Sequence, residues 1–77
     1  MNVARLRVGK LTAREVDILI LISCGATSKE IARGLYLSDS TVEKHLLSIR
    51  NKLDARTTPH AVALFLKEEL ASGVRVD

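Results

Sequence analysis

Apolar and polar residues alternate with a helical repeat in several successive segments of the chain. In residues 38–53, SDSTVEKHLLSIRNKL, the apolar residues Val42, Leu46, Ile49 and Leu53 recur at offsets of 4, 3 and 4. Such offsets place side chains on one face of an α-helix. The pattern therefore predicts a helix with one buried stripe and a polar opposite surface.

Residue types that favour the start of a helix are found before two earlier segments and at the start of this one. Thr12 and Thr27 each stand three residues before a glutamate, Glu15 and Glu30. This spacing is typical of a capping box, in which the two residues satisfy each other's free backbone N–H groups. Ser38 is predicted to cap the third helix in the same position.

The first two helices are expected to be short. We expect the first to end near Gly25 and the second to end at Gly34, after barely two turns. Cys24, the only cysteine, is predicted to be a small core residue. The residues expected to face inward are Val16, Leu19, Ile20 and Ile22 in the first helix and Ile31 and Ala32 in the second.

A fourth helix is predicted to begin at the cap Thr58, with Pro59 at its first position. It is expected to run to about Ala71 and to be ended by Gly73. Its apolar residues exceed what one core-facing side needs, which predicts a second contact, most simply a two-fold pairing of helices. The alternative is that the basic N-terminal segment or the tail covers this surplus. The predicted dimer residues are Val62, Phe65, Leu66 and Glu69.

These elements predict a single all-α domain of four helices, because no segment reads convincingly as a strand. The 77 residues suit one small domain. We expect a flexible basic N-terminal arm at residues 1–10, the folded domain at residues 11–72 and a C-terminal tail at residues 73–77.

Composition adds a modest preference for a polyanionic partner. The net charge is +3, and residues 1–14 hold four basic side chains and no acidic one. The longest apolar run, ILILI at residues 18–22, is too short to span a bilayer. No signal peptide is visible, so we expect a cytoplasmic protein without membrane contact.

No arrangement of residues predicts catalysis. Cys24 with His45 or His60 does not make a credible nucleophile and base, and the two histidines lack the spacing of metal ligands. We therefore expect no enzyme activity, no metal, no cofactor and no small-molecule ligand.

A short helix, a tight turn and a longer helix make a candidate helix-turn-helix motif. On the outer side of the longer helix, Lys44 could donate to guanine, Glu43 could accept from cytosine and Leu47 could meet a thymine methyl. Ser40 and Thr41 lie at its N-terminus, where a phosphate is favoured. These residue types suit contact with DNA.

The chain also resembles the LuxR-type (LuxR/FixJ, GerE-like) DNA-binding domain of bacterial transcription regulators, from residue 11 to about residue 70. The resemblance rests on LTAREVDIL at 11–19, KEIA at 29–32, the spacing S-x-x-T-V-x-x-H at 38–45 and KL at 52–53. Tyr36 departs from the pattern, because many members have glycine there. The chain looks like either an excised effector domain or a stand-alone regulator.

The resemblance implies a regulator that binds double-stranded DNA, with the third helix in the major groove and the fourth pairing in a homodimer. RNA polymerase is a further partner that it suggests. The implied base-reading residues are Glu43, Lys44, Leu47, Ser48 and Asn51. The implied phosphate contacts are Lys29, Ser40, Thr41, His45, Arg50 and Lys52.

Other interpretations remain open at the level of sequence. The chain could be a promoter-binding domain like region 4 of a sigma factor, or a helical protein-interaction module that binds no DNA. The basic residues of the third helix could also form a merely solvated face. His45 could contact phosphate or pack against the second helix.

Overall fold

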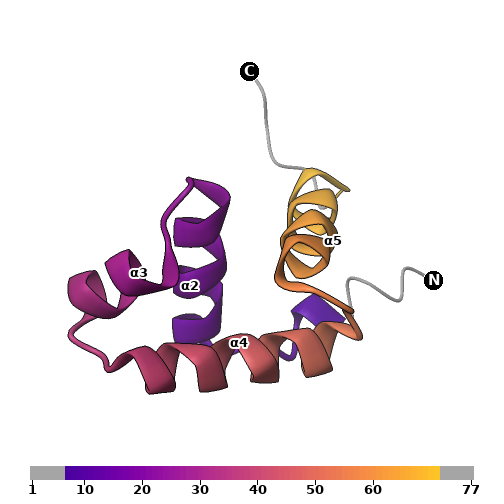
Figure 1. The fold of residues 1–77 in the computed structure, drawn as a ribbon. Coiled ribbons are helices and arrows are strands. Elements are labelled where there is room, and N and C mark those ends of the chain that lie inside the picture. Colours follow the sequence, from indigo (N-terminus) through magenta and orange to yellow (C-terminus); the bar gives the residue numbers. More distant parts are fainter. Residues whose placement is uncertain (1–6, 72–77) are drawn as a thin grey trace.

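The structure, a computed structural model, describes residues 7–71. Its principal helices, labelled as in Figure 1, are α2 (Ala13–Ser23), α3 (Ser28–Leu35), α4 (Asp39–Leu53) and α5 (Thr58–Ala71). No strand occurs in this part of the chain, which confirms the predicted all-α fold. Within the same range, no helix has the length and apolarity needed to cross a membrane.

Helix α4 is the base on which the other helices are assembled. It packs against α2, α3 and α5, which all lie on one side of it (Figure 1). Its predicted stripe is fully confirmed, because Val42, Leu46, Ile49 and Leu53 are all buried. The remaining core residues come from the three covering helices: Ile18, Leu19, Ile31, Ala32, Ala61 and Phe65.

Both predicted capping boxes are present. Thr12 Oγ1 accepts from the Glu15 N–H at 3.1 Å, and the Glu15 carboxylate accepts from the Thr12 N–H at 2.8 Å. The pair of Thr27 and Glu30 repeats this arrangement at the start of α3. At the start of α4, Ser38 Oγ accepts from the backbone N–H of its third residue at 3.1 Å, as predicted.

Two residues predicted to be buried, one in α2 and one at its C-cap, are exposed. Ile20 is 45% exposed, and Cys24 is exposed at the C-cap. The core covers only one side of this helix, where Ile18 and Leu19 are buried. Successive residues lie about 100° apart around a helix. A core that covers Ile18 and Leu19 therefore leaves the next residue, Ile20, facing solvent.

Two predicted helix limits also shift. Helix α3 continues through Gly34 to Leu35 and ends at Tyr36, whose φ of 58° is left-handed. The Leu35 side chain packs against the core, which favours the extra helical residue. Thr57, not Thr58, caps α5, because Thr57 Oγ1 accepts the His60 N–H at 3.1 Å.

The described end of the predicted basic arm forms a turn of helical character. Arg7 and Val8 are helical, and the Lys10 N–H donates to the Arg7 carbonyl at 3.0 Å. Val8 packs against the core, and Arg7 lies 3.7 Å from Asp54. Residues 1–6, Gly73 and the predicted tail at residues 73–77 lie outside the described residues.

Candidate nucleic-acid interface

One continuous surface of α4 faces away from the rest of the molecule. Burial of the apolar stripe leaves Glu43, Lys44 and Asn51 exposed and leaves Leu47 52% exposed. Ser40, one turn before Lys44, is also exposed. We call this set, Ser40, Glu43, Lys44, Leu47 and Asn51, the outer surface of α4. It brings together four of the five predicted base-reading residues and presents donors, acceptors and an apolar group side by side.

The first turn of α4 gathers three hydroxyl groups. Ser38 Oγ lies 2.8 Å from Thr41 Oγ1 and 3.2 Å from Ser40 Oγ. Ser40 is exposed and Thr41 is half-buried. Hydroxyl groups at a helix N-terminus, where backbone N–H groups and the helix dipole favour an anion, are suited to contact a phosphate.

Helix α3 presents two basic side chains beside this turn. Lys29 and Arg33 are both exposed and stand one helical turn apart. Together with Leu37 and Asp39 they line an open hollow between α3 and the start of α4. Arg33 was not among the predicted phosphate contacts. Its spacing of four residues from Lys29 is the signal that could have identified it.

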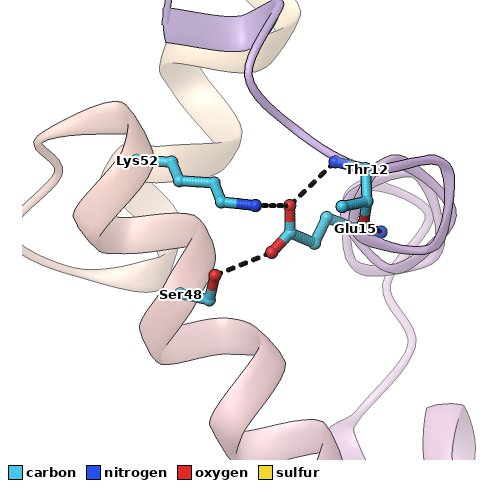
Figure 2. A network of polar contacts seen from close by, with 4 residues as sticks. All are labelled: Thr12, Glu15, Ser48 and Lys52. Carbon is cyan, nitrogen blue, oxygen red and sulfur yellow. Dashed lines mark hydrogen bonds and ion pairs between the residues drawn. The ribbon is translucent and has the colours of Figure 1, made fainter.

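Ser48 and Lys52 take different positions from those predicted. Ser48 Oγ donates to Glu15 Oε2 at 2.8 Å, and Lys52 Nζ donates to Glu15 Oε1 at 2.7 Å. Figure 2 shows both side chains directed from α4 toward Glu15, which also accepts from the Thr12 N–H. We call these four residues the Glu15 network. The geometry thus ties both residues to α2, whereas base reading by Ser48 and phosphate contact by Lys52 stay predictions.

The carboxylate at the centre of this network is held in its charged form. Glu15 is only 3% exposed, and this burial alone would raise its pKa. Hydrogen bonds from Lys52, from the Thr12 backbone and from Ser48 outweigh burial and lower the pKa from 4.5 to about 2. The charge on Lys52 is therefore compensated within the protein.

Arg50 makes a similar contact on another side of α4. Its Nη1 donates to Thr58 Oγ1, in the first residue of α5, at 3.0 Å. A guanidinium group has five N–H donors, so this bond leaves others for a phosphate. His45 is half-buried, which suits both of the roles predicted for it.

The predicted dimer residues on α5 divide between surface and core. Leu66 is 42% exposed, Glu69 is exposed and Val62 is half-buried against the core. Phe65 is only 4% exposed. Because this side chain is buried in the core, Phe65 is unsuited to contact a second molecule. Leu70, 69% exposed, is an apolar surface residue that the sequence interpretation missed.

Among residues 7–71, no group of three or more His, Cys, Asp or Glu side chains is arranged to hold a metal ion. The outer surface of α4 and the basic side chains of α3 present hydroxyl, ammonium, guanidinium, carboxylate and apolar groups. Such a mixture is suited to binding through hydrogen bonds and charge.

Comparison with known proteins agrees with this geometry. Residues 9–65 match the family described as GerE: Bacterial regulatory proteins, luxR family. The chain is 48% identical over 65 residues to the uncharacterized response regulatory protein YgeK of Escherichia coli (strain K12), which covers 84% of the chain and 42% of YgeK. It is 43% identical over 60 residues to the oxygen regulatory protein NreC of Staphylococcus haemolyticus (strain JCSC1435), which covers 78% of the chain and 28% of NreC.

The chain therefore spans less than half the length of these curated relatives. No solved structure matches the chain.

Proposed function

The chain belongs to the luxR family of bacterial regulatory proteins, and on this premise we propose that it reads operator DNA with α4 in the major groove. Its fold is that of a DNA-binding helix-turn-helix domain of a transcription regulator. The observation that carries the proposal is the outer surface of α4, where Glu43, Lys44 and Leu47 are exposed together. The family match also favours this interpretation over a sigma-factor domain.

Four residues of the outer surface have suitable partners among the base edges. Lys44 donates to guanine O6 and N7, Glu43 accepts from cytosine N4, and Leu47 contacts a thymine methyl. Asn51, farther along the helix, has the amide that pairs with adenine. A mixture of acidic, basic and apolar groups discriminates among base pairs better than a uniformly basic surface.

Phosphate contacts supply the affinity and its dependence on salt. In this proposal they come from Ser40 and Thr41 at the start of α4, from Lys29 and Arg33 on α3, and from His45. The free N–H groups of Arg50 add a further contact. Such contacts fix the position of the domain on the duplex without specifying a sequence.

A homodimer would place two such helices in successive major grooves. We propose that α5 pairs with its mate through Val62, Leu66 and Glu69, with Leu70 extending the contact. Dimeric helix-turn-helix proteins bind half-sites about one helical turn apart. In this proposal the regulator acts in the bacterial cytoplasm and contacts RNA polymerase at the promoter.

Selection of bound sequences from random duplex DNA, repeated at two salt concentrations, tests the proposal. Lys44→Glu should abolish binding to the selected duplex while the domain stays folded. Lys67→Glu, at an exposed position of α5, is the matched control and should bind normally. Unchanged affinity of Lys44→Glu would instead favour a protein-interaction module that does not bind DNA.

A further inference from the structure

The two capping boxes have the same local geometry but different surroundings. In each box the carboxylate of the glutamate accepts from the threonine N–H at 2.8 Å. Glu30 is exposed, whereas Glu15 is 3% exposed and accepts two further bonds from α4. Capping requires neither the burial nor these additional bonds, so Glu15 has a second role.

The additional bonds fix α4 at two points. Ser48 and Lys52 stand one helical turn apart on the side of α4 that faces α2, and each donates to a different oxygen of Glu15 (Figure 2). Hydrogen bonds depend steeply on distance and angle, whereas the burial of apolar side chains is non-directional. Two directional bonds a turn apart therefore resist both rotation of α4 about its axis and sliding along it.

The opposite side of α4 is anchored as well. Arg50 lies two residues from both Ser48 and Lys52, which places it about 200° around the helix from each. Its bond to Thr58 ties this side of α4 to α5. The buried stripe therefore has a polar anchor on each side, and neither anchor belongs to the residues of the outer surface.

We propose that Glu15 is a positioning residue that determines specificity: without touching DNA, it sets the rotation of α4 that directs Glu43, Lys44 and Leu47 at base edges. This inference rests on the proposed function of α4. Base contacts need correct geometry, whereas phosphate contacts through long basic side chains tolerate small shifts. Loss of the Glu15 anchor should therefore weaken specific binding more than non-specific binding.

The test compares wild type and Glu15→Gln on two probes, a duplex selected by the wild type from a random pool and a scrambled duplex of equal length. The glutamine keeps an oxygen in the place of Oε1, which still accepts from Thr12 and Lys52 but no longer carries the charge that pairs with Lys52. Its NH2 group, in the place of Oε2, cannot accept from Ser48. The ratio of the two affinities should fall about tenfold, which corresponds to the loss of one good base contact. Affinity for the scrambled duplex and its salt dependence should change little.

Glu30→Gln is the matched control, because it alters the equivalent capping contact in α3 at an exposed residue. It should leave the ratio at the wild-type value. Ser48→Ala provides a second variant that keeps the capping box and the Lys52 ion pair. It should lower the ratio in the same direction as Glu15→Gln but less, without changing which base is preferred at any single position.

Three results would overturn the inference. The first is a wild-type ratio in Glu15→Gln and Ser48→Ala when circular dichroism shows both to be folded. The second is an equal fall in both affinities, which marks a purely structural role. The third is a change of preferred base at one position in Ser48→Ala alone, which marks direct reading by Ser48. A wild type without preference for the selected duplex would contradict the proposed function itself.

Discussion

Lys52 Nζ lies 2.7 Å from Glu15 Oε1, although 37 residues separate the two along the chain. The contact joins the end of α4 to the start of α2. It gives each residue a tertiary role in addition to the role that its sequence motif indicates. Glu15 caps a helix and also anchors α4. Lys52 compensates a buried carboxylate rather than offering its charge freely to a phosphate.

Acid should weaken the fold through Glu15. Its pKa of about 2 lies below the ordinary value of 4.5, so its contribution is fully present above about pH 4.5 and is lost as pH falls toward 2. The contribution is on the order of 3 kcal/mol. Urea unfolding between about pH 6 and pH 2.5 should show the wild type losing its advantage over Glu15→Gln across this range. A difference in unfolding free energy that stays constant with pH would contradict the prediction.

Lys52→Met should leave the salt dependence of DNA binding unchanged, because Lys52 is paired with Glu15. Lys29→Met is the control, since Lys29 is exposed and is proposed to meet phosphate. Removing a phosphate contact lowers the slope of log affinity against log salt by about one. Titrations at several salt concentrations measure both slopes, and a fall of that size in Lys52→Met would show that Lys52 reaches DNA.

Leu66→Glu should weaken dimerisation while leaving the fold intact, because Leu66 is partly exposed on α5. A charge buried in a pairing of two apolar surfaces is costly, and we expect cooperative binding to paired half-sites to fall at least about tenfold. Val62→Glu should act in the same direction but also destabilise the monomer, since Val62 packs against the core.

Lys67→Glu, at an exposed residue about 100° around α5 from Leu66 and outside the proposed dimer residues, is the control for the dimer prediction. Sedimentation of each variant gives the oligomeric state directly. A wild type that is monomeric at high concentration and still binds paired half-sites with full affinity would exclude the proposed role of α5.

Tyr36→Gly should stabilise the domain by about 0.5–1 kcal/mol. Tyr36 adopts a left-handed conformation and is 95% exposed, so glycine removes backbone strain without loss of packing. Relief of that strain, about 1–2 kcal/mol, exceeds the greater entropy that glycine gives the unfolded chain. Thermal unfolding measures the gain. Asp54→Gly, at the other left-handed residue with a side chain among those described, should gain less, because aspartate tolerates this conformation better.

Local signals predicted much of the fold. The stripe of Val42, Leu46, Ile49 and Leu53 and the two capping boxes depend on residues three or four positions apart, so the sequence displays them directly. Cys24 and Ile20 were assigned wrongly because an unbroken apolar run does not show which side of a helix its neighbours will cover.

The exposed residues of the site could be predicted from the sequence, but the contacts that anchor α4 to the other helices could not. Lys44 and Leu47 followed from the position of the buried stripe alone. Ser48 bonds to a residue 33 positions away, and no spacing within α4 indicates that partner. Phe65 belongs to the core because α5 lies across α2 and α4, an arrangement that depends on tertiary packing.

Cys24 is the chain's single thiol, and it is exposed at the C-cap of α2. Figure 1 shows this end of α2 on the side of the molecule away from α4. A maleimide dye would therefore attach at one position per molecule and leave the outer surface of α4 uncovered. The wild-type chain is thus ready for fluorescence anisotropy or energy-transfer titrations with labelled duplexes, with no engineered cysteine.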